Sequence, residues 1–323
     1  MFIHLNTHSV YSPMRGLLSL SDLVDLSRSY GMDTLALTDV NGMWGFIRFV
    51  QHCRDAGINP IAGVNLITEK DEAVLLAENQ HGYENICRAV SAVHDDPSQS
   101  LADLVKSRVS GLFVLSHEAH TLKSLKTTIP DTHLFVELRP GIQETSTQNL
   151  GKKLKLEVVA TGDVYFRDPG DHDAHVTLRA IENNTTLEQL DLSECKSNQH
   201  YFRSEGEMVK LFPNSLDALN NSRYLADRCK TGWSFINTIF PGLSLKDTHR
   251  ANKELKDKVY AGAKIRYGEI NESIHQRIQY ELGIITQKGF SPYFLIVQDI
   301  VQQTRATIGR GSAAASVVSY CLF

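Results

Sequence analysis

The sequence predicts an α/β barrel that is followed by a mainly helical segment. In the first half of the chain, short apolar runs alternate with stretches of helical periodicity, as expected for βα units with covering helices. Helical spacing dominates after about residue 175. The polar stretch NNTTLEQLDLSECKSNQH interrupts the packing signals, so we place a boundary near residues 185–205 and expect domains at residues 1–190 and 191–323.

Seven short apolar runs are expected to be strands, and about seven strands would close a barrel better than they would form two small sheets. These runs are Phe2–Leu5, Thr34–Thr38, Pro60–Ile67, Ala73–Ala77, Leu112–Ser116, Leu134–Leu138 and Glu157–Thr161. Because βα units repeat the direction of the strand, we expect a mainly parallel sheet.

Helical stretches lie between most of these runs. In the first half we expect helices at Ser21–Tyr30, Trp44–Ala56 and Tyr83–His94. Ser21 is a suitable N-cap for the first, and Gly31 and Gly57 follow the ends of the first two.

Two apolar stripes at helical spacing mark the second half of the chain. The first consists of Leu255, Val259, Ala263 and Tyr267, and the second of Ile274, Ile278, Leu282 and Ile285. Gly289 is expected to end the second helix, and Ser291 with Pro292 is expected to begin another, with the serine as N-cap.

Charge is unevenly distributed along the chain, although the net charge is only −4. Residues 1–195 contain 16 Lys+Arg and 26 Asp+Glu, a net charge of −10, whereas residues 196–323 contain 17 and 11, a net charge of +6. A basic C-terminal part fits a nucleic-acid partner, and it equally fits ordinary solvated helix faces.

The composition points to a globular cytoplasmic protein with no membrane partner. No apolar run approaches the roughly 18 residues of a membrane span, and the start MFIHLNTHS lacks the features of a signal peptide. The five cysteines are far apart and form no CxxC pair, so we interpret them as reduced thiols.

Polar residues follow several of the expected strands, which is where βα barrels carry their chemistry. They include Asn6 and His8, Asp39, Asn65, His117, Arg139, and Asp163 with Tyr165. Histidine with aspartate could bind zinc or manganese and support phosphoester hydrolysis. The alternative is a set of polar caps and turn residues, because Asn and Asp commonly bond their own backbone at strand ends.

The N-terminal residues resemble the PHP (polymerase and histidinol phosphatase) domain that is fused to bacterial DNA polymerase III alpha subunits. The resemblance rests on FIHLNTHSVYSPMRGLLSL, AGINPIAGVNLI, LFVELRPG and ATGDVYFRDPGDHDAH. It continues in the same order through YFRSEGEMVKLFPN and YGEINESIHQRIQYELGIITQKGFSPYFLIVQDIV to GRGSAAASVVSY. It implies a PHP-type distorted (β/α)7 barrel, followed by a helical segment that begins the polymerase palm and thumb.

The metal site departs from the pattern that this resemblance implies. The replaced ligand positions are Asn6, Val40, Asn65 and Tyr165, where the family carries histidines and a carboxylate. The matching positions that remain are His8, Asp39, His117 and Asp163, a set that would hold at most one ion weakly. We therefore expect no Zn²⁺ or Mn²⁺ site and interpret the barrel as an inactive scaffold.

A glycine-rich turn leads toward a helix near the end of the chain. Glycines let a backbone approach a phosphate, and a helix N-terminus offers free N–H groups to it. By resemblance, Arg310, Gly311 and Ser312 match the family's segment for the incoming nucleotide's triphosphate. The preceding loop is shorter than usual, and Ala315 replaces a glycine.

Three functions are compatible with these observations. The first is the N-terminal portion of a DNA polymerase III alpha-like subunit for replication or repair synthesis, with DNA, deoxynucleotide triphosphates and other replication subunits as partners. Its palm carboxylates, a PDxDxD-like run that holds Mg²⁺ in the full-length family, do not occur before Phe323, so we assign no catalytic residue and expect this chain alone to be inactive. The alternatives are a stand-alone PHP phosphoesterase and a non-catalytic DNA- or partner-binding module.

Overall fold

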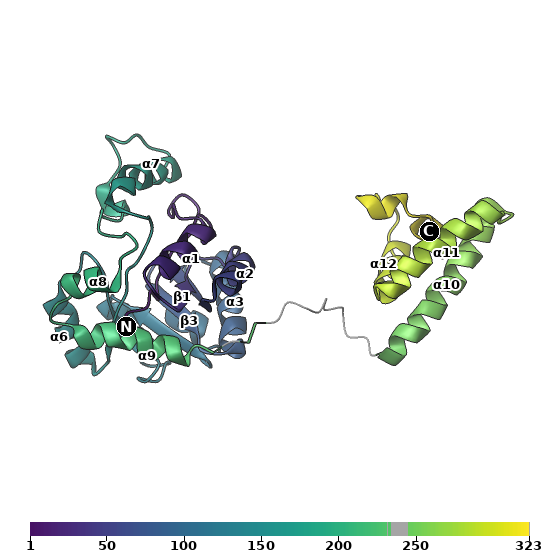
Figure 1. Ribbon diagram of the computed structural model, residues 1–323. Helices are drawn as coiled ribbons and strands as arrows, with labels where there is room; N and C mark the ends of the chain where they lie inside the picture. The colour runs from purple at the N-terminus through teal and green to yellow at the C-terminus, as the bar shows by residue number, and fades with distance from the viewer. Residues whose placement is uncertain (231, 234–244, 323) are drawn as a thin grey trace. The chain divides into compact units, whose positions relative to one another are not determined.

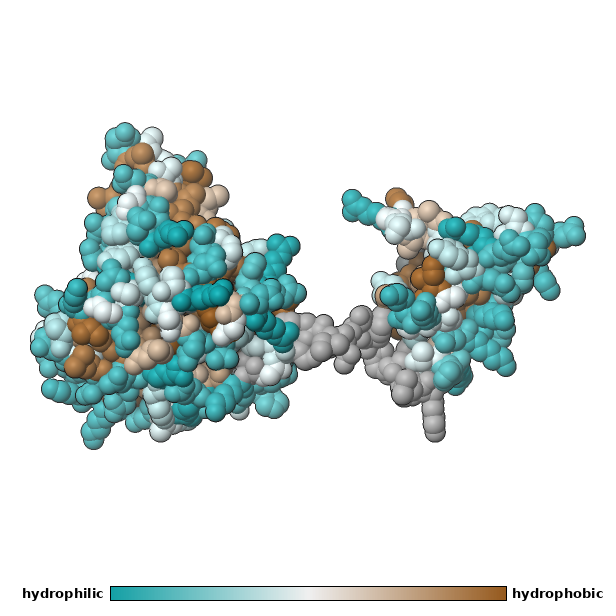
Figure 2. Space-filling model, viewed as in Figure 1, coloured by the Kyte–Doolittle hydropathy of each residue, from teal (hydrophilic) through white to brown (hydrophobic). Residues whose placement is uncertain are grey.

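The computed structural model describes residues 1–230, 232–233 and 245–322. It divides into two compact units, Met1–Trp233 and Ser234–Phe323 (Figure 1), and each has its own hydrophobic core. Hydrophilic residues dominate the surface in the view of Figure 2, with hydrophobic residues interspersed. Among the described helices, none is long and apolar enough to cross a membrane.

The first unit is built around a six-stranded sheet whose spatial order follows the chain (Figure 1). The strands are β1 (Thr34–Leu37), β2 (Asn59–Ile67), β3 (Glu72–Ala77), β4 (Leu112–Ser116), β5 (Leu134–Leu138) and β6 (Val158–Ala160). Neighbours pair in parallel except at β3, which is antiparallel to both β2 and β4. The expected parallel direction fails at β3 because a tight turn between Thr68 and Asp71 replaces a helical crossover.

Nine α-helices and two 3₁₀ turns are described in the same unit. The helices are α1 (Leu20–Ser29), α2 (Phe46–Ala56), α3 (Gln80–Asp95), α4 (Leu101–Val105), α5 (Ala119–Leu125), α6 (Glu144–Leu154), α7 (His172–Glu182), α8 (Glu205–Leu211) and α9 (Leu216–Arg228). The 3₁₀ turns are η1 (Pro169–Asp171) and η2 (Leu192–Glu194). The three helices expected before residue 100 correspond to α1, α2 and α3.

The first helix begins two residues earlier than expected. Ser19, not Ser21, is its N-cap, and it forms a capping box with Asp22. The side-chain oxygen of Ser19 accepts from the N–H of Asp22, while the Asp22 carboxylate accepts from the N–H of Ser19. Ser21 has no carboxylate three residues later, so it cannot form a capping box, and the helix is capped by Ser19 instead.

The N-terminal segment closes the sheet, although Phe2–Leu5 is not formed as a strand. The N–H of Thr38 donates to the carbonyl of Thr7 at 2.9 Å, and the N–H of Val164 donates to the carbonyl of Asn6 at 3.1 Å. Residues 6 and 7 therefore link β1 on one side to the chain that follows β6 on the other.

The start of the chain bonds to helices in place of a strand ladder. The N–H of Phe2 donates to the carboxylate of Glu205 in α8, and the N–H of Ile3 donates to the hydroxyl of Ser222 in α9, both at 3.0 Å. The N–H groups of Phe2 and Ile3 are thus satisfied by helix side chains, whereas the carbonyl of His4 accepts from the N–H of Ala36 in β1 at 3.1 Å.

Alternation along the strands divides the apolar residues into two cores. The outer core lies between the sheet and the surrounding helices and includes Leu35, Val64, Leu75, Val114 and Val136. The inner core consists of Ile3, Leu5, Ala36, Ile61, Val74, Leu76, Phe113, Leu115, Phe135, Val159, Leu225 and Ala226. The last two belong to α9, so this helix covers the interior of the barrel.

The first unit extends past the boundary expected near residue 190. Helix α9 packs against β6 and supplies Leu225 to the inner core. At the end of the unit, the Trp233 ring contacts the rings of Phe46 and Tyr83 with centroids 4.9 and 5.0 Å apart. Residues 191–233 therefore belong structurally with the barrel.

The second unit is helical, as expected. It consists of α10 (Leu245–Tyr267), α11 (Glu272–Gln287), α12 (Ser291–Gln302), a 3₁₀ turn η3 (Ser312–Ala315) and α13 (Val317–Leu322). Its core joins the two expected stripes, through Leu255, Val259 and Ala263 of α10 and Ile278, Leu282 and Ile285 of α11. Tyr267 lies outside this core at the end of its helix.

Two expected features at the ends of helices differ in this unit. Phe290, not Ser291, occupies the N-cap of α12, and the Ser291 side chain is buried. The turn before residue 312 leads first into the short η3 and only then into α13, so no long helix begins at Ser312.

We predict that residues 1–233 unfold cooperatively as an isolated chain, whereas residues 1–190 do not fold. Removal of α8 and α9 exposes the inner core and leaves the N–H groups of Phe2 and Ile3 without their acceptors. Urea unfolding followed by circular dichroism is the measurement. A sharp transition for residues 1–190 would contradict this domain assignment.

Candidate functional site

Strand alternation brings a set of polar side chains together at one end of the barrel. Successive residues of a strand face opposite sides, so residues two or four positions beyond an inner-core residue face the interior again. Such positions are occupied by Thr38, Asn65, His117, Glu137, Thr161 and Asp163. The predicted residues Asn65, His117 and Asp163 thereby meet in the interior.

The reversed strand β3 adds a carboxylate to this end. Its first residue, Glu72, pairs with Ile67 at the end of β2. The hydroxyl of Ser116, the last residue of β4, donates to the carbonyl of Glu72 at 2.8 Å. Because β3 runs opposite to its neighbours, its beginning lies beside their ends, and Glu72 enters the site.

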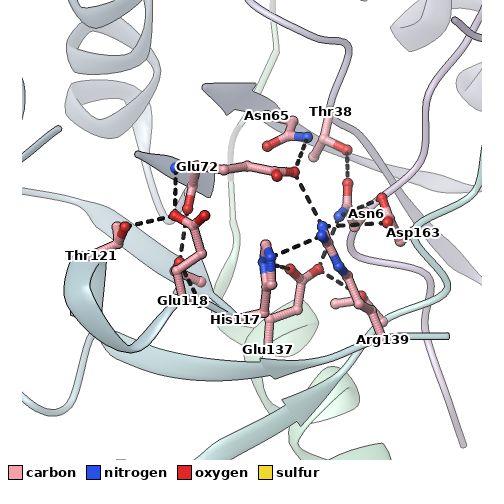
Figure 3. A network of polar contacts seen from close by, with 12 residues as sticks. Asn6, Thr38, Asn65, Glu72, His117, Glu118, Thr121, Glu137, Arg139 and Asp163 are labelled. Atoms are coloured by element: carbon pink, nitrogen blue, oxygen red, sulfur yellow. Dashed lines mark hydrogen bonds and ion pairs between the residues drawn. The ribbon is translucent and has the colours of Figure 1, made fainter. Parts of the chain in front are cut away.

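Arg139 lies at the centre of the polar network (Figure 3). Its guanidinium donates to Glu72 Oε1 at 3.1 Å and to His117 Nε2 at 2.9 Å, and it lies 3.4 Å from Asp163 Oδ2. Because arginine can only donate, His117 Nε2 accepts and the proton of this imidazole is on Nδ1.

A second cation reaches the site from the segment after α7. Lys196 Nζ donates to Asp163 Oδ2 at 2.9 Å. The backbone of Lys196 is held by α7, since its carbonyl pairs with His172 Nε2 at 3.0 Å and its N–H donates to His175 Nε2 at 3.1 Å. His200 Nδ1 lies 3.2 Å from the same carboxylate oxygen.

Asn6 connects the N-terminal segment to two buried acids. Its amide donates to Glu137 Oε1 at 2.9 Å and to Asp163 Oδ1 at 3.3 Å, and its oxygen accepts from the Thr38 hydroxyl at 2.9 Å. The Thr161 hydroxyl also donates to Glu137 Oε1, at 2.7 Å. The amide at position 6 is therefore a structural bridge.

His8 packs against the residue that replaces a further expected ligand. The rings of His8 and Tyr165 are stacked with centroids 3.9 Å apart. His8 Nδ1 donates to the carbonyl of Val164 at 3.0 Å, which leaves Nε2 facing the amide of Asn65 at 3.5 Å. The Asn65 amide also donates to Glu72 Oε1, at 3.1 Å.

Asp39 has a separate role from the other predicted ligands. Its carboxylate accepts from the N–H of Ser9 at 2.7 Å and from the hydroxyl of Ser12 at 2.7 Å. The Ser12 hydroxyl in turn accepts from the N–H of Val40 at 3.0 Å. Asp39 thus holds the turn after the N-terminal segment, and the buried Val40 side chain offers no ligand atom.

The three acids inside the network differ in their expected charge. Burial opposes ionisation of Glu72, but Lys196 and Arg139 prevail and lower its pKa to about 2. The same two cations hold the pKa of Asp163 well below its usual range, again against burial. Burial instead raises the pKa of Glu137, and the Asp163 charge adds to this effect. Two ionised acids therefore face two cations.

Two histidines of the site, His8 and His117, are neutral at physiological pH. Burial lowers the pKa of His8 to about 4. Burial and the adjacent Arg139 charge lower the pKa of His117 to about 4.

The residues present do not fit a multi-metal centre. Arg139 and Lys196 already compensate the charges of Glu72 and Asp163. The guanidinium and ammonium groups lie beside the carboxylate oxygens, where a metal ion would have to bind. A divalent ion would place further positive charge beside them. Within the described ranges, no group of three or more His, Cys, Asp or Glu residues has a geometry that could hold a metal.

Three charged residues of the network were not among the predicted site residues: Glu72, Glu137 and Lys196. Glu137 has a detectable signal, since it is a charged residue at an inner position of the apolar strand LFVEL. Lys196 has no such signal, because it lies in a polar stretch that resembles an ordinary loop.

The predicted phosphate-binding residues belong to the second unit. Arg310, Gly311 and Ser312 are exposed, and Gly311 has φ +78°, a conformation that favours glycine. A mainly apolar cavity of about 330 Å³ adjoins them and is lined in part by Phe294, Val297 and Arg310.

Comparison with known proteins gives two family matches. The PHP domain model matches residues 4–131, and the model of the bacterial DNA polymerase III alpha NTPase domain matches residues 253–323. Among curated relatives, the error-prone DNA polymerase of Symbiobacterium thermophilum is 31% identical, with 100% of this chain and 34% of the relative aligned. The DNA polymerase III subunit alpha of Pasteurella multocida is 30% identical, with 99% and 32% aligned.

Over its whole length, the chain is similar to the N-terminal part of the bacterial DNA polymerase III alpha subunits. It spans about a third of the length of the curated relatives it matches. A further member, the subunit alpha of Escherichia coli K12, is 28% identical over 99% of this chain and 32% of its own length.

Likeness to solved structures is weaker than likeness in sequence. An amidohydrolase from Chromobacterium violaceum aligns with TM-score 0.41 and 11% identity over 51% of this chain and 88% of its own. A two-domain protein from Bacteroides vulgatus, described as containing a predicted PHP-like metal-dependent phosphoesterase, aligns with TM-score 0.35 and 13% identity over 69% and 63%. The PHP-type fold is assigned here from the family match and the strand arrangement.

We predict opposite responses when the two central acids are changed to amides. Glu137→Gln should alter the free energy of unfolding by less than about 1 kcal/mol, because the pKa of Glu137 is raised and its oxygen can still accept two hydrogen bonds. Asp163→Asn should destabilise by about 3–5 kcal/mol, because Lys196 and Arg139 lose a buried counter-charge. Urea unfolding at pH 7.5 compares them, and equal losses would contradict the charge assignment.

A second prediction concerns the pH dependence of stability. Burial raises the pKa of Asp39 to about 6, above its ordinary value of 3.8. The folded state then binds a proton more tightly, so Asp39 contributes added stability as pH falls from above 6 toward 4, by up to about 3 kcal/mol. Asp39→Asn should remove this rise. Unfolding free energies at pH 4–8 test it, and an unchanged slope in the variant would assign the effect to another group.

Proposed function

We propose that the chain is the N-terminal portion of a DNA-directed DNA polymerase that acts in replication or repair synthesis. One observation carries the proposal: the sequence aligns in order, over 99–100% of its length, with the alpha subunits and the error-prone polymerase named above. The basic residues 196–323, with a net charge of +6, support a role near nucleic acid. A cytoplasmic location and contact with other replication subunits are part of the same proposal.

The PHP-like barrel serves in this proposal as a non-hydrolytic scaffold. Its polar centre ties together the N-terminal segment through Asn6, β5 through Glu137 and Arg139, and the segment after α7 through Lys196. Hydrolysis of a phosphoester by a PHP centre requires ligands that Asn6, Val40, Asn65 and Tyr165 do not supply. These features favour the scaffold over a stand-alone phosphoesterase.

The glycine-rich segment of the second unit is the proposed phosphate contact. Arg310 would supply charge, and Gly311 and Ser312 would supply backbone N–H groups to a deoxynucleotide triphosphate. They cannot replace the carboxylates that hold two Mg²⁺ ions in polymerases. Asp299 precedes the segment, and no Asp or Glu follows it in the sequence.

Primer extension tests the proposed function. The 323-residue chain should not extend a DNA primer with Mg²⁺ and four nucleotides, whereas a polypeptide that continues through the native reading frame should do so. Arg310→Ala in the longer polypeptide should weaken nucleotide use. The polymerase proposal fails if the frame contains no carboxylate run of the PDxDxD type, or if the longer polypeptide is inactive. Extension by the 323-residue chain would show that its catalytic site is already complete.

Metal analysis tests the scaffold separately. After dialysis against buffer with trace Zn²⁺ and Mn²⁺, the chain should retain less than one ion per molecule, since Arg139 and Lys196 compensate the available carboxylates. Elemental analysis gives the count. Retention of two or three ions, accompanied by hydrolysis of a phosphomonoester, would favour the phosphoesterase instead.

A further inference from the structure

Helix α12 is apolar around most of its circumference. One side is buried and contributes Leu295 to the core of the second unit. On the other side, the exposed apolar residues recur at positions i, i+3, i+4 and i+7, so they form one stripe, the α12 stripe: Tyr293, Ile296, Val297 and Ile300. A helix that is hydrophobic all round normally lies in a protein interior.

A cavity extends the α12 stripe toward the glycine-rich segment. Its volume is about 330 Å³, its lining is mainly apolar, and Val297 belongs to both the stripe and the lining. Val301 and the almost fully exposed Ile308 add further apolar surface to its wall. Single exposed apolar residues are ordinary on a protein surface, but a stripe that continues into an apolar cavity indicates a contact surface.

A buried amide provides a second and independent sign that this surface is covered. Gln298 is only 8% exposed and lines the cavity. Its Nε2 donates to the carbonyl of Leu322 at 3.1 Å, whereas its Oε1 has no hydrogen-bond donor among the described residues. A buried acceptor without a donor is costly, which indicates that whatever covers the cavity supplies an N–H or O–H group.

The last described residue lies against the same surface. Leu322 lines the cavity, and its carbonyl is the acceptor of Gln298. A polypeptide that continues beyond α13 therefore begins at the wall of the cavity. The match to the NTPase domain model runs to residue 323, and the chain spans only about a third of the curated relatives.

These observations favour a continuing chain as the occupant of the stripe. With 12 residues, α12 is too short to span a membrane, so its apolar surface calls for a protein cover. A tethered segment is present at a high effective concentration, whereas a second copy of the chain has to associate from solution.

We propose that the segment that follows residue 323 in the native reading frame packs on the α12 stripe and fills the cavity. This covering segment is apolar where it meets Ile296 and Ile300, and it donates a hydrogen bond to Gln298 Oε1. The inference rests on the proposed function only in requiring a longer polypeptide, and it does not require that polypeptide to polymerise DNA.

Thiol labelling tests whether the stripe is covered. Ile300→Cys places a thiol on the stripe, and Ile181→Cys on α7 is the matched control, because the two isoleucines are 58% and 57% exposed. Each variant is made in the 323-residue chain and in the polypeptide that continues through the native reading frame. The rate of reaction with a maleimide is measured, and the unsubstituted polypeptides, with their native cysteines, give the background.

The two thiols should react at similar rates in the 323-residue chain. In the longer polypeptide, the thiol at position 300 should react about tenfold more slowly or less, because it is reached only when the covering segment opens. The thiol at position 181 should keep its rate.

A second substitution tests the hydrogen bond to Gln298. Gln298→Met keeps the length of the side chain but removes both polar atoms. In the longer polypeptide it should speed labelling at position 300 by about fivefold, since the covering segment loses one hydrogen bond. Gln302→Met is the matched control, because Gln302 is an exposed glutamine of the same helix and does not line the cavity.

Three outcomes would overturn the proposal. One is an equal labelling rate at position 300 in both polypeptides, and another is a reading frame that does not continue. The third is protection of position 300 in the 323-residue chain itself, which would assign the stripe to the first unit or, if protection rises with concentration, to a second copy. A longer polypeptide that protects position 300 but does not extend a primer would uphold this inference while the polymerase proposal fails.

Discussion

The barrel depends on the compensation of one buried charge, the carboxylate of Asp163. This side chain is inaccessible to solvent, yet the ion pairs that it forms hold its pKa far below the ordinary range. Its partners come from distant parts of the chain: Asn6 at the start, Arg139 after β5, and Lys196 beyond α7. Because an unpaired charge at this depth would cost several kcal/mol, these segments must assemble together.

In this arrangement the positive charge beside the buried carboxylates is carried by side chains of the protein itself. A metal centre needs several neutral imidazoles and carboxylates around a free ion. Here Asn6, Val40 and Tyr165 are amide, aliphatic and phenolic groups, and the positive charge arrives on Arg139 and Lys196. The inward-facing carboxylates of the barrel are therefore part of a buried salt-bridge network.

Much of the fold could be predicted because it follows from periodicity. Alternation in runs such as Leu112–Ser116 and Leu134–Leu138 marks strands directly, and both match the structure. The direction of β3 could not be predicted, since the same apolar pattern fits either direction. Within the site, Asn65, His117 and Asp163 could be predicted, because each lies at or just after the expected end of a strand. Lys196 could not be found this way, because only the tertiary contacts of α7 with its backbone bring it to Asp163.

The order of the strands has a consequence for the time course of folding. Each strand pairs with its neighbour in the chain, so the sheet can grow through contacts of short sequence separation. The closure made by residues 2–8 is different, because Phe2 and Ile3 bond to side chains more than 200 positions away. During synthesis Phe2 and Ile3 emerge early, but the acceptors of their N–H groups follow only when α8 and α9 have left the ribosome. Completion of the inner core is therefore the late, long-range step, because α9 supplies Leu225 and Ala226 to it.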